Sequence, residues 1–226
     1  MGYVGTGRFT AYSALHDLDG ALQTANSSIA SANSSIASAN SSLAAINTLL
    51  ASGVKTIFLS CAGGWSSATL PDAGFLSAET STNKVNFKGT KMAASASDQK
   101  HEFGLIMPMN YNGGTVTGKA VFYVPSSTDA SSHTVIFGLQ GVAIASGGTA
   151  DTAYGTAQEV TYTVASSIAG KIITTDAIAA MTIAGSPAGG NWHQFRTYRK
   201  GSDTYTGDLI LLGWILNYTT DNYSDV

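Results

Sequence analysis

Residues 15–50 read LHDLDGALQTANSSIASANSSIASANSSLAAINTLL, and this stretch decides how the whole chain is organised. Apolar residues recur along it at alternating spacings of three and four, which is the heptad repeat of a coiled coil. The unit NSSIASA occurs twice in succession and is followed by NSSLAAI. A repeat of 3.5 residues keeps one seam facing a partner when helices supercoil left-handedly, so the stretch predicts a helical stalk shared by parallel copies of the chain. The seam consists of Leu15, Leu18, Leu22, Ala25, Ile29, Ala32, Ile36, Ala39, Leu43, Ile46 and Leu50.

The remaining faces of this predicted helix are almost free of charge. No charged residue occurs between Asp19 and Lys55, and serine and asparagine are weak helix formers. The helix therefore depends on association along its seam. The alternative, a disordered linker of low complexity, is disfavoured because an apolar residue stands at every seam position. The seam leaves the number of helices open, since its alanines permit close dimers while its Ile and Leu residues suit dimers or trimers.

Composition argues against several classes of function. The chain has 226 residues, a net charge of −3 and only 11% charged residues, so we expect no nucleic-acid partner. No apolar run approaches the roughly 20 residues that a membrane-spanning helix needs, and the first residues lack the basic and apolar regions of a signal peptide. Cys61 is the single cysteine, which rules out an intrachain disulfide and suggests a buried thiol.

The stalk divides the chain into three predicted parts. Residues 1–14 contain glycine and aromatic side chains and are too short to fold alone, so we expect an anchor peptide that becomes ordered within a larger assembly. The coiled-coil stalk occupies residues 15–52, and Gly53 is suited to cap its end. Residues 53–226 form the predicted head domain.

The composition and residue pattern of the sequence change after the stalk. Short runs rich in β-branched and aromatic residues alternate with turn signals, as in 158–165, where Val160, Tyr162 and Val164 fall on one face. This pattern predicts two packed antiparallel sheets rather than a parallel α/β fold. We expect an eight-stranded jelly roll, because its double sheet limits exposed edges. The predicted strands cover 54–61, 85–88, 101–109, 115–124, 134–145, 158–165, 192–200 and 208–219, and 171–184 is ambiguous between helix and strand.

The end of the chain bears a resemblance to a known family. Residues 195–218 read FRTYRKGSDTYTGDLILLGWILNY, which resembles the closing hairpin of jelly-roll modules in tailed-phage virion proteins. The shared pattern is an arginine-bearing strand, a D-T-Y turn, a Gly-Asp pair, an aliphatic L-x-G and a final strand that ends in tyrosine. Trp65, the run from Phe103 to Pro108 and the run Lys119–Val124 fit the same family, so the resemblance covers about residues 60–220.

This resemblance implies a homotrimer on the surface of a virion. Members of the family look like fibres or spikes in which a short peptide fixes the protein, a coiled coil lifts it and three jelly rolls form the head. The same three parts are predicted here in the same order, which favours three helices over two. The resemblance also implies that residues 1–14 contact other virion proteins. The long, nearly uncharged stalk departs from many relatives and leaves attachment to capsid or tail open.

Few groups of residues suggest catalysis. Asp203 and Asp208 flank Tyr205, and two carboxylates roughly 5–9 Å apart would suit glycoside hydrolysis. We favour a structural role for both, with Asp203 capping a turn and Asp208 pairing with Arg196 or Arg199. No two histidines share a metal-ligand spacing; they are His16, His101, His133 and His193. We therefore expect no enzyme activity, no metal and no other cofactor.

Aromatic residues beside predicted loops are the better functional lead. Aromatic faces stack on sugar rings, and loops on a rigid β-scaffold are common recognition sites. The alternative is that each ring packs in the core or at a contact between subunits, and for Trp214 we expect the core. The candidates for contact with host surface glycans are Trp65, Tyr111, Tyr154, Trp192 and Tyr198.

These features together predict a structural virion protein, a trimeric fibre or spike whose head binds host surface glycans weakly. Attachment to the capsid competes with a tail-borne receptor-binding role. From another class, a depolymerase that degrades host surface polymer stays open. A host-encoded adhesin stalk is a third alternative, against which the missing signal peptide and membrane anchor count.

Overall fold

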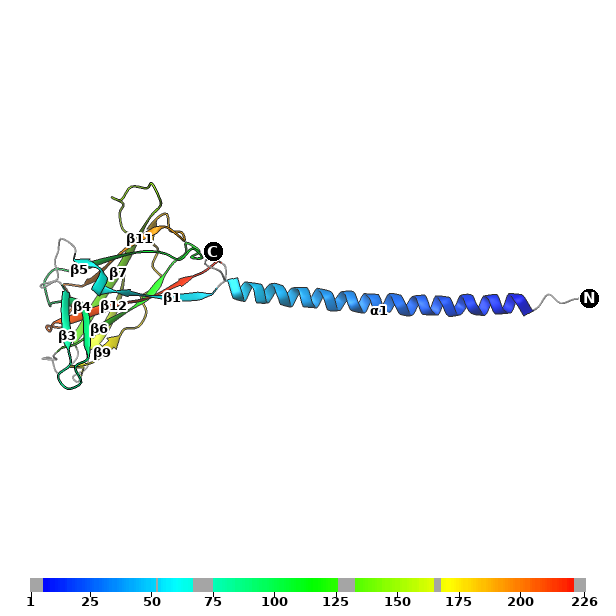
Figure 1. Cartoon of the computed structure of the whole chain (residues 1–226), viewed down its shortest axis with the longest axis horizontal. Helices are drawn as coiled ribbons and strands as arrows, with labels where there is room; N and C mark the ends of the chain where they lie inside the picture. The colour runs from blue at the N-terminus through cyan, green and yellow to red at the C-terminus, as the bar shows by residue number, and fades with distance from the viewer. Residues whose placement is uncertain (1–5, 52, 67–74, 126–132, 165–167, 222–226) are drawn as a thin grey trace, which may run out of the picture. The chain divides into compact units, whose positions relative to one another are not determined.

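The computed structural model describes residues 6–51, 53–66, 75–125, 133–164 and 168–221. The chain divides into two compact units, Met1–Leu50 and Ala51–Val226. The first unit is helical and the second, which we call the head, consists of strands (Figure 1). Among the described residues, no helix has both the length and the apolar character needed to cross a membrane.

Helix α1 (Thr6–Ala51) is uninterrupted over 46 residues. It begins at Thr6, nine residues before Leu15, where we predicted that the coiled-coil stalk starts. No proline occurs between these two residues, and a helix that has nucleated propagates through neighbouring residues that do not break it. The helix therefore takes in most of the predicted anchor peptide, whose residues 1–5 lie outside the described part of the chain.

Serine and threonine hydroxyls on α1 bond back to the helix itself. Thr24 Oγ1 donates to the carbonyl oxygen of Gly20 at 2.9 Å, and Ser34 Oγ donates to that of Ala30 at 3.0 Å. The same bond to the carbonyl four residues earlier recurs at Ser41. Each of these bonds gives the hydroxyl a partner inside the helix. The hydroxyl then does not compete for the backbone groups that form the helix.

The seam residues of α1 form an exposed apolar row on the single chain. Ala25, Ala32 and Ala39 are exposed, and the side chain of Leu50 lies outside the described residues. Pairing of copies along this row stays a prediction. The large seam residues, all more than half exposed, are Leu15, Leu18, Leu22, Ile29, Ile36, Leu43 and Ile46.

The described residues of the head form two six-stranded sheets. In the first sheet, β1 (Val54–Ser60) pairs with β12, and the other strands follow the order β3 (Phe75–Glu79), β4 (Asn86–Met92), β12 (Leu209–Thr219), β6 (Thr117–Tyr123) and β9 (Ile172–Thr174). In the second sheet, β8 (Gln158–Val164) pairs with β7, and the order is β10 (Ala184–Gly185), β7 (His133–Ile144), β11 (Trp192–Arg199), β5 (Gln99–Ile106) and β2 (Trp65–Ser66). A single 3₁₀ turn, η1 (Cys61–Gly63), follows β1 in the described chain.

The strand order is that of a jelly roll. The strands β4, β12, β6 and β9 form one antiparallel layer, and β5, β11, β7 and β8 form the other. Apart from the step from β7 to β8, successive strands of this set lie in opposite sheets, which is the double Greek key of that fold. The predicted antiparallel jelly-roll sandwich is thus confirmed for the head. The short strands β2 and β3 were not predicted, and the ambiguous segment 171–184 yields β9 followed by irregular backbone.

The core lies between the two sheets and is rich in aromatic residues. Phe122 from the first sheet contacts Phe137 from the second, with ring centroids 5.1 Å apart. Trp214 is fully buried as predicted, and its Nε1 donates to Thr197 Oγ1 at 2.8 Å. Cys61 is also buried as predicted, and burial raises the pKa of its thiol. Alternate residues of each strand face this core, so the others form the two outer faces of the sandwich.

Candidate functional site

The outer face of the second sheet gathers several of the predicted aromatic residues. Phe103 on β5 and Phe195 on β11 point into the core and are buried. Their neighbours along each strand point outward, because side chains alternate across a strand. We call the resulting surface the aromatic face; its residues are Trp65, Glu102, Ile106, Tyr154, Trp192, Gln194 and Arg196.

Trp192 is the first residue of β11 and lies opposite Ile106, the last residue of β5. Its indole extends diagonally from β11 over Gly104 on β5, where a Cβ would stand only 2.1 Å from Cζ2 of the ring. Its Nε1 donates to Gln194 Oε1 at 3.2 Å, and the side chain is 44% exposed. The absence of a Cβ at Gly104 thus allows the Trp192 ring to pack against the backbone of β5, while part of the ring stays exposed.

Trp65 stands at the edge of the same face. Strand β2 places it opposite Glu102 on β5, which in turn lies opposite Arg196 on β11. Arg196 Nε donates to Glu102 Oε1 at 2.7 Å. Trp65 is 68% exposed. The three residues form a row across three strands, with an exposed ring at one end and an ion pair beside it.

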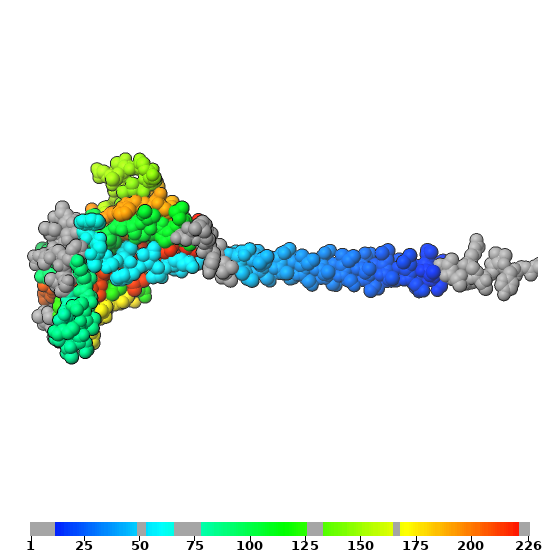
Figure 2. All heavy atoms as spheres, in the orientation of Figure 1, coloured from blue at the N-terminus to red at the C-terminus, as the bar shows by residue number. Residues whose placement is uncertain are grey.

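Tyr154 comes from the segment 145–157 that joins β7 to β8. Figure 2 shows this segment, in yellow-green, standing out from the body of the sandwich. The guanidinium carbon of Arg196 lies 4.2 Å from the centre of the Tyr154 ring, within the range of a cation–π contact. Burial, together with the charge of Glu102, raises the pKa of Tyr154 to about 12, so its hydroxyl keeps its proton at neutral pH. Arg196 is therefore fixed from two sides, by a carboxylate and by a ring.

Two of the predicted glycan-contact residues are buried instead of exposed. Tyr198 lies on the outer side of β11 but covers Gly138, donates its hydroxyl to Glu159 Oε1 at 2.7 Å and is only 8% exposed. Tyr111 is 2% exposed and contacts His193 edge to face. Tyr111 and Tyr198 thus follow the alternative of a packed ring, because each is covered by its own neighbours.

The paired carboxylates near the last turn have structural partners. Asp203 accepts two hydrogen bonds from Arg199, at 2.7 and 3.0 Å, and both side chains are almost fully buried. Asp208 pairs with Lys91 at 2.9 Å. Our prediction that Asp208 pairs with Arg196 or Arg199 is therefore wrong. Asp203 holds the turn through Arg199, whereas we predicted that its side chain caps the turn.

The histidines are dispersed among the described residues. His16 is exposed on α1, and Nδ1 of His133 lies 2.8 Å from the carbonyl oxygen of Thr204. His101 and His193 are buried in the head, and burial lowers the pKa of both, that of His101 to about 4. Within the described part of the chain, no cluster of three His, Cys, Asp or Glu side chains is suited to a metal ion.

The polar members of the aromatic face were missed by sequence reasoning. Glu102 and Gln194 were not considered, and Arg196 was considered only as a partner for an aspartate. A signal was present, since every second residue from Trp192 to Tyr198 is aromatic or polar and therefore belongs to one face of a strand.

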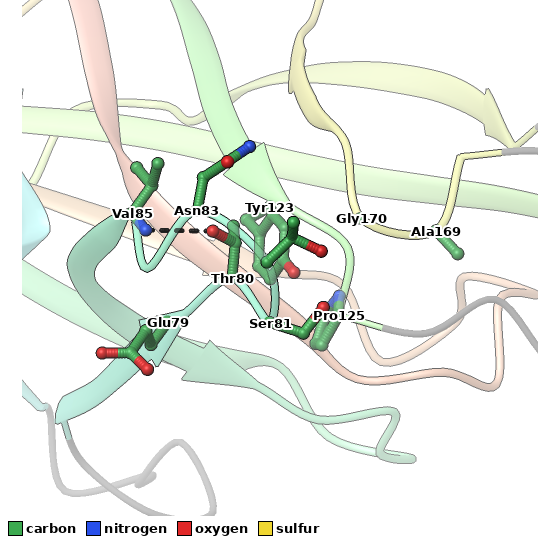
Figure 3. A pocket seen from close by; sticks show the side chains of 10 residues that line it. Glu79, Thr80, Ser81, Asn83, Val85, Tyr123, Pro125, Ala169 and Gly170 are labelled. Carbon is green, nitrogen blue, oxygen red and sulfur yellow. Dashed lines mark hydrogen bonds between the residues drawn. The ribbon is translucent and has the colours of Figure 1, made fainter.

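Apart from the aromatic face, the head has a groove between the turn that joins β3 to β4 and the segment around Gly170. Figure 3 shows Thr80, Ser81 and Asn83 around Tyr123 in this groove of about 680 Å³. Thr80 Oγ1 accepts a hydrogen bond from the Val85 backbone at 2.9 Å. The Thr80 hydroxyl braces the turn and Tyr123 is only 9% exposed, so the groove offers less recognition chemistry than the aromatic face.

No protein-family model matches the chain, and no curated protein sequence matches it. The head is similar to several solved structures. The N-terminal endo-1,4-β-D-xylanase 10B of Clostridium thermocellum, as CBM22-1–GH10 modules complexed with xylohexaose, shares 17% identity, with a TM-score of 0.38 over 73% of this chain and 28% of that chain. The CBM22-1 xylan-binding domain of Paenibacillus barcinonensis Xyn10C shares 10% identity, with a TM-score of 0.39 over 74% of this chain and 95% of that domain.

A third similar structure is Caldicellulosiruptor saccharolyticus CBM27-1 in complex with mannohexaose. It shares 11% identity with this chain, and the match covers 77% of this chain and 100% of that one at a TM-score of 0.34. Xylohexaose and mannohexaose are the ligands of the first and third of these proteins, and xylan binding is a property of the second.

Proposed function

We propose that this protein binds carbohydrate through the aromatic face of its head and that its helix joins copies of the chain into a trimer. The observation that supports the first part is the gathering of Trp65, Trp192 and Tyr154 around the Glu102–Arg196 pair on one outer face. The sequence places these residues far apart, and the fold brings them together.

The chemistry of the aromatic face suits a sugar. A sugar ring has an apolar face of C–H groups and a rim of hydroxyls, so it pairs with an aromatic ring flanked by hydrogen-bonding groups. Glu102 supplies acceptors, Arg196 supplies donors and the Gln194 amide supplies both. Because the ion pair and the Tyr154 ring already hold Arg196 in place, little side-chain entropy is lost when a ligand binds.

Binding rather than hydrolysis is the proposed activity. A glycosidase needs a carboxyl group that is protonated and can donate to the leaving oxygen. The Glu102 carboxylate accepts a hydrogen bond from Arg196 Nε at 2.7 Å and is therefore occupied within the aromatic face. Asp203 is enclosed by its two bonds to Arg199. The Glu102–Arg196 pair therefore suits ligand recognition, and the Asp203–Arg199 pair suits a structural role in the turn.

The exposed seam of α1 supports the proposal of a trimer. A row of Leu and Ile side chains that are more than half exposed is stabilised when copies pack along it. The resemblance of the closing hairpin to tailed-phage virion proteins leads us to propose a fibre or spike on a virion surface, with residues 1–14 contacting other virion proteins. Three heads would convert weak single-site binding into stronger attachment to a surface that presents many copies of one glycan.

The test of the carbohydrate site is binding by the full-length chain to a glycan array that includes xylohexaose, mannohexaose and bacterial surface polysaccharides. We expect Trp192→Ala and Trp65→Ala each to weaken binding of the best ligand about tenfold, which corresponds to about 1.4 kcal/mol. Ile172→Ala is the matched control, since Ile172 on β9 in the first sheet is 54% exposed. Failure of the unaltered protein to bind any glycan, or unchanged binding by both tryptophan variants, would refute the proposal.

A further inference from the structure

Strand β1 presents an apolar row on the outer face of the first sheet. Val54 is 69% exposed and Phe58 is 52% exposed, with Thr56 between them. Leu59, one position further, points to the core and is buried. We call Val54, Thr56 and Phe58 the β1 row.

The β1 row belongs to an open edge strand. Strand β1 pairs with β12 along its full length, from Val54 opposite Thr219 to Ser60 opposite Gly213. Among the described strands, none pairs with the other side of β1. An edge strand of this length with exposed apolar side chains tends to associate with another protein surface.

The groups of the β1 row can be buried at low cost. Val54, Thr56 and Phe58 are uncharged, so covering them desolvates no ion. Thr56 Oγ1 already donates to Asn217 Oδ1 on β12 at 2.9 Å and would keep this partner inside an interface. The Phe58 ring lies over Gly213, where a Cβ would stand 2.7 Å from its Cζ. The row is therefore preorganised for packing.

Chain connectivity indicates what covers the row. Only residues 52 and 53 separate the end of α1 from the start of β1. Consecutive Cα atoms are about 3.8 Å apart, so Val54 stays within about 11 Å of Ala51 in every orientation of the head. Packed helices lie about 8–10 Å apart. Pairing along the helix seam would thus bring the β1 strands of different copies close together.

We infer that the β1 rows of neighbouring copies pack against one another around the common axis and join the heads of the oligomer. This inference rests on the proposed association of the helices. It assigns the two exposed surfaces of the head to different partners, a second copy of the chain at β1 and a glycan at the aromatic face.

The test is cross-linking, with a short bis-maleimide, of full-length variants that each carry one added cysteine. The variants are Ile36→Cys in the helix seam, Phe58→Cys in the β1 row and Ile172→Cys on β9. The native Cys61 is buried, and burial raises the pKa of its thiol, so it contributes no reactive background. We expect covalent dimers from the first two variants and none from the third, with a yield unchanged by tenfold dilution of the protein.

The outcomes separate the inference from the proposal on which it rests. Cross-linking at position 36 without cross-linking at position 58 overturns the head contact and leaves the stalk intact. Cross-linking at 58 alone supports the head contact and refutes the seam. Absence of both, or equal cross-linking at 172, overturns the inference. Thr56→Cys repeats the test with the Phe58 side chain in place, in case its loss disturbs the strand.

Discussion

The aromatic face and the β1 row both present exposed apolar side chains, but they differ in the polar groups that surround those side chains. On the aromatic face, Trp65 lies opposite Glu102, and the charges of Glu102 and Arg196 hold each other in place. On the β1 row, Val54, Thr56 and Phe58 carry no charge, and the Thr56 hydroxyl is already bonded to Asn217 within the head. A mixed surface suits a ligand with many hydroxyls, and a uniform one suits the apolar core of a protein interface.

The glycines beneath the two surfaces differ in a related way. A Cβ on Gly104 would meet the Trp192 indole, which is a side chain that can move. A Cβ on Gly213 would meet the carbonyl oxygen of Leu59 at 2.2 Å, which is backbone of β1. The first glycine therefore sets the position of a ring, and the second allows a strand to pair.

The largest expected effect comes from breaking the helix seam. Ile29→Asp combined with Ile36→Asp places charges at two seam positions that are more than half exposed in the single chain, and the variant should not associate. Light scattering should then give the 23.2 kDa of one chain instead of about three times this mass. Attachment to a glycan-coated surface should fall roughly 10²-fold or more, because avidity is lost.

The same variant distinguishes the two surfaces of the head. Its affinity for a short soluble oligosaccharide should equal that of the unaltered protein, because the aromatic face is complete in one chain. Phe58→Cys introduced into it should no longer cross-link. A parallel loss of oligosaccharide affinity would indicate that the aromatic face also depends on a second copy.

The next largest effect is expected from the two glycines. Gly213→Ala should destabilise the head by about 1–3 kcal/mol, since overpacking against backbone forces β1 away from β12. Gly104→Ala should cost less stability but should displace the Trp192 ring and weaken glycan binding. Urea unfolding and glycan titration of both variants provide the check. Equal losses of stability would mean that the two glycines serve the same purpose.

Acid should weaken the sheet below the aromatic face. Burial lowers the pKa of His101 to about 4, although a bond to the Cys61 carbonyl and the charge of Glu102 act in the opposite direction. The unfolded chain, with an ordinary histidine pKa near 6.5, binds more protons between these values. Stability is therefore full above about pH 6.5 and declines as the pH falls toward about 4.

The measurement is the urea midpoint between pH 7.5 and 4. His101→Gln is the matched control, because this variant cannot take up the proton and should lose less stability over the same interval. His193 also has a pKa lowered by burial and should contribute in the same direction. A midpoint that does not change between pH 6.5 and 4 would contradict this account.

Sequence reasoning reached the jelly roll because its signals are local. Alternating apolar residues and turn signals mark strands such as β8, and the heptads mark α1. Burial of Tyr111 and Tyr198 could not be read in this way, since a ring becomes covered only when a neighbouring strand supplies the right partner, as Gly138 does for Tyr198. The start of α1 at Thr6 was missed because the heptad pattern was taken as its limit.

The smallest effect is expected at the ion pair of the aromatic face. Arg196→Gln removes the bond to Glu102 and the contact with the Tyr154 ring, both partly exposed, and should cost about 0.5–1 kcal/mol of stability. Glycan affinity should fall severalfold, because the guanidinium donors are lost and Tyr154 loses the group on which it stacks.

Lys200→Gln is the matched control for this change. Lys200 forms an ion pair of the same length, 2.7 Å, with Glu159 on β8, but it lies outside the aromatic face. It should change stability by a similar amount and leave glycan affinity unaltered. If the two variants weaken binding equally, general surface charge rather than the fixed Glu102–Arg196 pair governs recognition, and the aromatic face would resemble the β1 row in relying on apolar contact alone.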